Sequence, residues 1–193
     1  MPFLALIPAL LLPAAAGARV SVDSLEAKGQ VRVCLSLSVE KDVAIQGCRE
    51  ALALGLAPDW AAAIRLYLAR RLADAMRWDE VIEVYRTLAE SRPRDAEARL
   101  RLGNALLFGV GRGAEAEGAY RQALELAPEE AAAWGGLGAA LNAQARHSEA
   151  ATAFERALAV DPGYFDSHEA SRVVYEASRR NEVWPPVTAA TTP

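Results

Sequence analysis

Few residues in this chain could do chemistry, and they do not assemble into a catalytic or metal-binding site. The two histidines, His147 and His168, stand alone, and the two cysteines, Cys34 and Cys48, are not grouped with them at metal-ligand spacing. Neither a nucleophile-elbow motif nor a zinc-protease motif is present. The sequence therefore predicts a protein that is not an enzyme and uses no metal and no cofactor.

A glycine-rich stretch at residues 109–113 (GVGRG) invites comparison with loops that cradle phosphate groups. Such loops follow a β-strand and end in Lys-Ser or Lys-Thr, and both features are missing here. Glycine also widens turns, because it adopts backbone conformations that other residues avoid. A widened turn is the better interpretation of this stretch.

Composition indicates a globular protein of one domain. The chain has 193 residues, of which 52% are hydrophobic and 24% are charged. Its net charge of −4 argues against nucleic-acid binding, which requires a basic face. The arginines at 65, 70, 71 and 77 could form a local basic strip, but a solvated helix face explains them better.

The elements that organise the chain are most regular in residues 131–164, which read as a helix, a polar turn and a second helix. Apolar and small residues recur there at helical spacing: Trp134, Leu137, Gly138 and Leu141, then Ala150, Phe154 and Ala157. Pro162 cannot continue the second helix, because it lacks a backbone N–H. The unit is therefore a helical hairpin with small residues where the two helices come closest.

This pattern resembles the tetratricopeptide repeat, a helical hairpin of about 34 residues with Trp, Leu, Gly, Tyr, Ala, Phe, Ala and Pro at set places. The match recurs upstream, which gives three units at residues 62–95, 96–130 and 131–164. The resemblance implies an all-α fold, a right-handed superhelical solenoid of antiparallel hairpins. The distance from Gly103 to Gly138 is 35 residues, one more than from Pro128 to Pro162. We therefore expect one inserted residue in the turn at residues 109–113.

The N-terminal region begins with an uncharged apolar run, residues 1–18, which ends in the small residues of a cleavage site. It resembles a secretory signal peptide, although it lacks a basic start and is interrupted by Pro8. Residues 19–58 are interpreted as a polar leader and a degenerate N-terminal hairpin. Residues 31–38 alternate as a strand would, but by analogy with the repeats we expect a first helix at 29–39 and a second at 43–54.

Cys34 and Cys48 each lie seven residues from Lys41, the centre of the expected turn in that hairpin. An antiparallel hairpin would place them at the same level. In an exported protein we expect a disulfide between them, which would contribute about 3 kcal/mol to stability. In a reducing compartment they would instead be two buried thiols that pack as small hydrophobic side chains.

Residues 165–180 form a further amphipathic helix without a partner, which would cap the array. Residues 181–193 are rich in proline and threonine and are expected to be disordered.

The repeat family binds proteins and peptides in a concave groove lined by the first helices. Carried over by position, that groove holds Leu66, Arg70, Leu100, Asn104, Phe108 and Asn142. Such a surface would suit an extended peptide or a partner helix, with the polar members bonding to main chain or to a carboxylate. Some domains of this family bind a C-terminal carboxylate through a clamp of Lys and Asn. This chain has Leu66 and Arg70 at those places, so the sequence does not predict that clamp.

Taken together, the sequence resembles bacterial-type exported tetratricopeptide repeat proteins. We expect a non-enzymatic interaction module, periplasmic or extracellular, that binds another protein or a peptide and acts as an adaptor in envelope assembly or secretion. The alternatives are a cytoplasmic location and a structural protein that associates with copies of itself.

Overall fold

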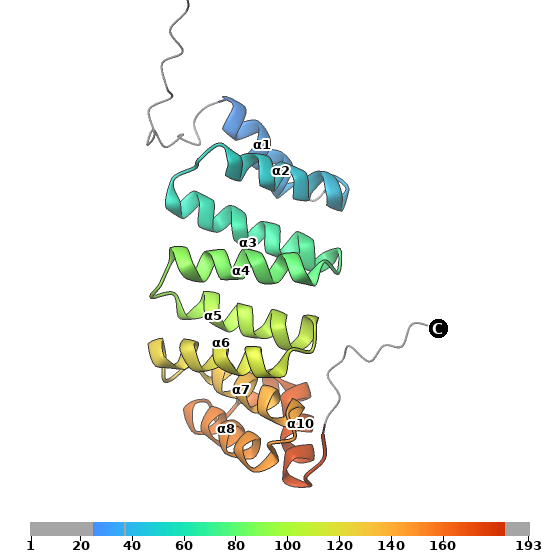
Figure 1. Cartoon of the computed structure of the whole chain (residues 1–193), viewed down its shortest axis with the longest axis vertical. Coiled ribbons are helices and arrows are strands. Elements are labelled where there is room, and N and C mark those ends of the chain that lie inside the picture. Colours follow the sequence, from blue (N-terminus) through green and yellow to red (C-terminus); the bar gives the residue numbers. More distant parts are fainter. Residues whose placement is uncertain (1–24, 37, 184–193) are drawn as a thin grey trace, which may run out of the picture.

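Helices form every regular element in residues 25–36 and 38–183, the part of the chain that the computed structural model describes. Figure 1 shows them stacked across the long axis of the molecule, from α1 at one end to α8 and α10 at the other. In chain order the helices are α1 (Leu25–Leu35), α2 (Lys41–Ala53), α3 (Pro58–Asp74), α4 (Trp78–Ser91), α5 (Ala96–Asn104), the π-helix η1 (Ala105–Gly109), α6 (Gly113–Leu126), α7 (Ala131–Ala143), α8 (His147–Val160), α9 (Tyr164–Ser167) and α10 (Glu169–Arg179).

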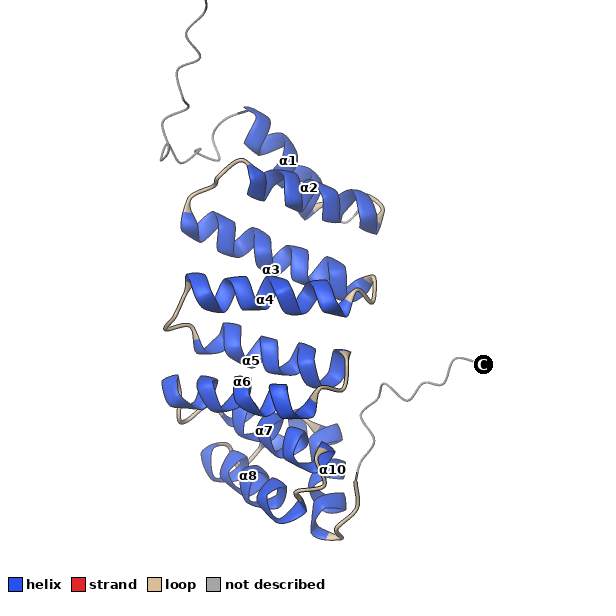
Figure 2. Ribbon diagram, in the orientation of Figure 1, coloured by secondary structure: helices blue, strands red, loops and turns tan. Residues whose placement is uncertain are grey.

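Sequence neighbours pair into four hairpins, α1 with α2, α3 with α4, α5 with α6 and α7 with α8, and each hairpin packs on the next. Figure 2 shows the short connections that join them. The fold is an all-α helical repeat, as the sequence predicts.

Close contact inside the hairpins depends on small residues that face an aromatic ring. A Cβ atom built at Gly103 would lie 2.7 Å from the Tyr120 ring, and one built at Gly138 would lie 2.8 Å from the Phe154 ring. Both rings are fully buried. Glycine therefore makes room for the aromatic side chain that fills each of these two hairpins.

One backbone feature recurs at the ends of α3, η1 and α7, the first-helix sides of three hairpins, and also at the end of α10. Met76, Gly111, Ala145 and Asn181 all have positive φ, between 57° and 70°. In a Schellman-type ending, the amide after this residue bonds back to the last helical turn. Arg77 N and Arg146 N do so, as does Glu182 N, which bonds to the Ala177 carbonyl at 2.9 Å. Thus α10 ends in the same way as a first helix of the array.

The N-terminal hairpin differs from the sequence expectation in its first helix. That helix is α1, so it starts four residues earlier than the expected 29–39 and ends at Leu35. Residues 25–29 thus belong to the helix rather than to a leader. Val31 and Cys34, one helical turn apart, are its buried side chains among residues 28–36. Buried residues three positions apart fit a helix, although residues 31–38 alternate between apolar and polar as a strand would.

The C-terminal helix, expected to run unbroken over 165–180, is divided into α9 and α10. The chain breaks at His168, which has φ −131° and ψ 57°. The His168 ring stacks on Tyr164 with 4.3 Å between centroids, and its Nδ1 lies 3.0 Å from the Tyr164 carbonyl oxygen. The stacked pair thus accounts for the break.

The sequence assigns residues 181–193 to a disordered tail, but residues 181–183 have a defined place. The Asn142 Nδ2 donates a hydrogen bond of 3.0 Å to the Glu182 carbonyl. The rest of that tail, and the signal peptide expected at 1–18, lie outside the described residues.

Candidate functional site

A cavity of about 620 Å³ opens between α3, α4, α5 and η1. We call it the α3–α5 pocket. Its lining residues come from two successive hairpins: Leu66, Tyr67, Ala69, Arg70, Ala73, Trp78, Val81, Tyr85, Arg101, Asn104, Ala105 and Phe108. Leu66, Tyr67 and Phe108 are 40%, 45% and 48% exposed, which is unusual for large apolar side chains. The pocket is therefore an apolar surface open to solvent.

Four of the six groove residues predicted from the sequence line this pocket: Leu66, Arg70, Asn104 and Phe108. Leu100 does not line it, because its side chain is buried in the core that α5 shares with its neighbours.

Asn142 is also absent from the pocket lining and is fully buried. Its Nδ2 donates hydrogen bonds to the Ser178 Oγ at 2.8 Å and to the Glu182 carbonyl at 3.0 Å. The positional assignment of Asn142 to an open groove is therefore not what the structure shows. The residue lies under the C-terminal helix and ties it to α7.

The single inserted residue of the second repeat shapes the pocket wall. The insertion was expected in the turn at 109–113, but the structure absorbs it one step earlier, in the π-helix η1. The backbone hydrogen bonds that end these helices show where the extra residue lies. Arg77 N bonds to the Leu72 carbonyl and Arg146 N to the Leu141 carbonyl, whereas Arg112 N reaches the Leu106 carbonyl, one residue further back. Single π-turns inside helices often mark functional sites, and Phe108 lies within this one.

Trp78 and Gly109 fit together at the base of the same wall. A Cβ atom at Gly109 would lie 2.7 Å from two ring carbons of Trp78. Glycine is therefore needed for the indole to occupy its place in the pocket lining. Trp78 is not among the groove residues predicted from the sequence.

The sequence also missed Tyr67, Tyr85 and Arg101 as lining residues. Tyr67 follows Leu66 on α3, and Arg101 precedes Asn104 by three residues on α5. The repeat pattern does not assign either position to the groove. Tyr85 lies on the second helix α4, whereas the repeat pattern assigns the groove to first helices. An exposed aromatic residue next to a predicted groove position is the one signal that would have found Tyr67.

The charged side chains that line the pocket are both arginines, Arg70 and Arg101. Arg101 forms an ion pair of 2.7 Å with Glu97 on its own helix. Asn104 accepts a hydrogen bond of 2.7 Å from the Tyr120 hydroxyl through its Oδ1. Burial, and next the charge interaction with Tyr164, raise the pKa of Tyr120 far above its usual value. The phenol therefore remains protonated, and its hydrogen bond fixes the orientation of the Asn104 amide.

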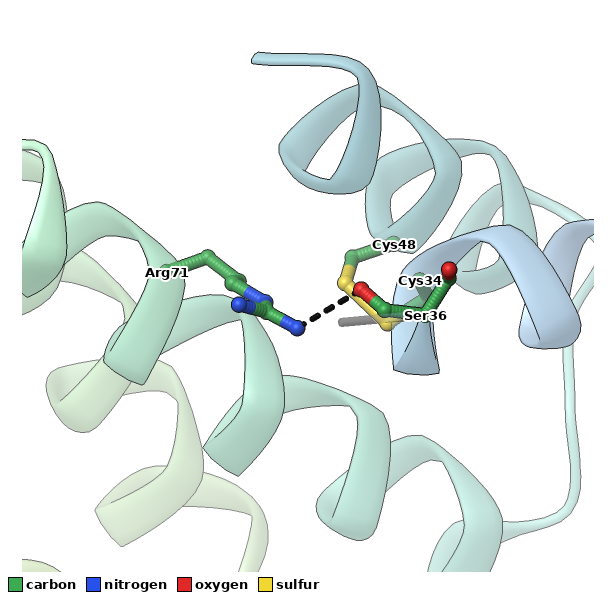
Figure 3. The surroundings of a disulfide bond; sticks show 4 residues. All are labelled: Cys34, Ser36, Cys48 and Arg71. Atoms are coloured by element: carbon green, nitrogen blue, oxygen red, sulfur yellow. Dashed lines mark hydrogen bonds between the residues drawn. A yellow bond between two sulfur atoms is a disulfide. The ribbon is translucent and has the colours of Figure 1, made fainter. Parts of the chain in front are cut away.

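The N-terminal hairpin is held by the disulfide between Cys34 and Cys48, both fully buried (Figure 3). It also docks on α3 beside the pocket. The Arg71 guanidinium donates a hydrogen bond of 2.8 Å to the Ser36 carbonyl, as Figure 3 shows. Lys41 Nζ donates one of 2.6 Å to the Asp74 carbonyl. These contacts anchor the C-terminal end of α3, which carries Arg70.

Within the described residues, no cluster of three or more His, Cys, Asp or Glu side chains could hold a metal ion. Over the same part of the chain, no helix is long and apolar enough to span a bilayer.

The family of this chain follows from its match to a model of known repeats. A tetratricopeptide repeat model matches residues 66–109 and 106–165, which together cover just over half of the chain. The chain belongs to the tetratricopeptide repeat family. Members of this family are, in general, non-enzymatic modules for protein interaction. A search of curated proteins returned no significant match.

Solved structures of the family share the fold. A double mutant of MamA from RS-1 superposes with a TM-score of 0.64 at 18% identity, over 82% of this chain and 91% of that one. MamA from AMB-1 gives a TM-score of 0.60 at 25% identity, over 74% and 83%. YrrB, described as a repeat protein with an unusual peptide-binding site, gives 0.58 at 19% identity, over 68% and 66%.

Proposed function

We propose that this protein is a non-enzymatic interaction module that binds a peptide or a partner helix in the α3–α5 pocket. The observation that carries the proposal is the pocket itself, about 620 Å³ lined by exposed apolar side chains and hydrogen-bond donors. Concave apolar sites with a few fixed polar groups are typical ligand sites. YrrB, which shares the fold, is a precedent for peptide binding.

The proposal includes an exported location and a role as an adaptor in envelope assembly or secretion. The Cys34–Cys48 bond supports export, because structural disulfides persist mainly in oxidising compartments. The apolar, uncharged residues 1–18 support it independently.

The test is a pull-down from envelope and soluble fractions with three forms of the chain: wild type, the pocket variant Arg70→Glu/Phe108→Ala, and a matched control, Arg156→Glu/Leu126→Ala. Arg156 and Leu126 are also exposed, but they lie on the second helices α8 and α6. A partner retained by the wild type and the control, and lost by the pocket variant, supports the proposal. Equal recovery of every partner by all three forms rejects the pocket as the site.

Self-association remains the competing hypothesis from the sequence. Light scattering during size-exclusion chromatography distinguishes the two: we expect a monomer, and a dimer disrupted by Arg70→Glu/Phe108→Ala would show that the pocket receives a second copy instead.

A further inference from the structure

The α3–α5 pocket has an unbalanced charge. Its lining includes two arginines and an asparagine, but no aspartate or glutamate. The chain as a whole has a net charge of −4, so this local excess of positive charge runs against the composition. A surface of this kind attracts a ligand of opposite charge.

The two arginines differ in whether their guanidinium groups already have a partner. Arg101 is paired with Glu97 at 2.7 Å. Arg70 is exposed and, among the residues that the structure describes, has no ion-pair or hydrogen-bond partner. Its guanidinium can therefore form a new bidentate pair with a carboxylate without first breaking another.

Asn104 supplies a second donor in a fixed orientation. Its Oδ1 is occupied by the Tyr120 hydroxyl at 2.7 Å, and that phenol is buried and protonated. The other end of the amide, its NH₂ group, is left for the ligand on an exposed side chain. With Oδ1 taken by the Tyr120 hydroxyl, Asn104 presents its NH₂ donor to the pocket.

The remaining lining is apolar and aromatic. Tyr67 and Phe108 are each nearly half exposed, and Trp78, whose ring packs on Gly109, lines the same pocket. Aromatic rings arranged in this way gain free energy by covering their faces with another apolar side chain. A small anion alone would leave them in contact with water.

We infer that the pocket binds an extended peptide segment in which an aspartate or glutamate stands next to a bulky aliphatic or aromatic side chain. The carboxylate pairs with Arg70 and accepts from the Asn104 NH₂ group. The apolar side chain covers Tyr67 and Phe108. This inference rests on the proposed function, since it specifies the chemistry of the ligand at that site.

The test uses a phage-displayed library of random peptides, selected in parallel on immobilised wild type, Arg70→Glu and the matched control Arg156→Glu. Selected peptides are then synthesised, and their binding to each form and to Phe108→Ala is measured by fluorescence polarisation. Urea denaturation of every variant verifies that it is folded.

On wild type and on Arg156→Glu, we expect selected peptides with an acidic residue beside a large apolar one. Arg70→Glu should weaken their binding by at least about tenfold, the loss of one charge-assisted hydrogen bond, and its own selection should lose the acidic residue. Replacing the acidic residue by its amide should weaken binding to the wild type similarly.

Other outcomes separate this inference from the proposed function. Peptides that lose binding to Phe108→Ala but show no acidic enrichment would overturn the inference and leave the pocket as the site. Peptides that bind Phe108→Ala and Arg70→Glu as tightly as wild type would overturn both, as would a selection that yields no peptide.

Discussion

In the hairpin of α7 and α8, aromatic rings occupy the space beside three glycines, whereas between α3 and α5 the stack stays open as a pocket. A Cβ atom at Gly135 would meet the Tyr164 hydroxyl at 1.8 Å, and one at Gly136 would meet the Tyr120 ring at 2.4 Å. In the α3–α4 and α5–α6 hairpins, by contrast, Leu66, Arg70 and Phe108 remain exposed and line the pocket.

Agreement with the repeat pattern and the open pocket therefore lie in different parts of the array. The α7–α8 hairpin matches the family best, and aromatic rings fill the space beside its glycines. One wall of the α3–α5 pocket is η1, where the α5–α6 hairpin departs from the family by one inserted residue and carries Phe108. Four predictions test or refine the contrast, in order of decreasing effect on stability.

The largest effect is expected at the N-terminal hairpin, where a disulfide replaces a ring. Cys48 stands where the other hairpins carry Tyr85, Tyr120 and Phe154. Replacing Cys34 and Cys48 by alanine should lower the free energy of unfolding by about 3 kcal/mol, because the unfolded chain regains freedom. Urea denaturation measures the loss. Two free thiols, found by mass spectrometry in protein purified from an oxidising compartment, would contradict the account.

Gly135→Ala should cost about 2 kcal/mol, because the new methyl group displaces Tyr164, which is only 3% exposed. The matched control is Gly118→Ala. Gly118 lies inside α6 with no neighbour near its missing Cβ, so alanine there should leave stability unchanged or raise it. If both variants unfold at the same urea concentration as wild type, the close packing of Tyr164 on Gly135 of α7 is wrongly described.

Asn142→Ala should cost about 1 kcal/mol, because Ser178 and the Glu182 carbonyl lose a buried donor. The effect should be local, with faster hydrogen exchange in α10 and unchanged exchange in α3. Weaker binding of a selected peptide to a folded Asn142→Ala protein would contradict the structural role and return Asn142 to the groove.

Phe108→Ala should change stability by less than about 0.5 kcal/mol, since the side chain is 48% exposed. It should nevertheless weaken binding of a selected peptide by about tenfold, as truncation of an aromatic anchor does. Leu126→Ala, which removes a side chain that is 41% exposed on α6, serves as the control and should change neither. A loss of stability as large as that of Gly135→Ala would mean that Phe108 belongs to the core.

The sequence predicted the fold because the repeat pattern is local: a small residue facing a ring, then a proline, recurs at a fixed period. Of the six groove residues that it predicts by position, Leu66, Arg70, Asn104 and Phe108 line the pocket. Leu100 and Asn142 are buried instead. Position alone could not show this, because their burial depends on neighbouring helices, and α10 covers Asn142 from outside the repeat that contains it.

Trp78 and Tyr85 could not have been found by position. They come from the second helix of a hairpin, and they line the pocket only because the next hairpin is placed against them. The insertion was recognised from the spacing of two glycines, but spacing cannot tell whether a helix or a turn absorbs it. In the structure the π-helix η1 absorbs it, and Gly109 at the end of η1 leaves room for Trp78.

The most direct test of the central claim is an NMR titration of the ¹⁵N-labelled chain with a peptide selected on the wild-type protein. The account predicts that the backbone amides of residues 66–73 and 101–108 shift most, and that those of residues 135–142 do not respond. The largest shifts in residues 135–142, with the α3–α5 pocket unaffected, would contradict it.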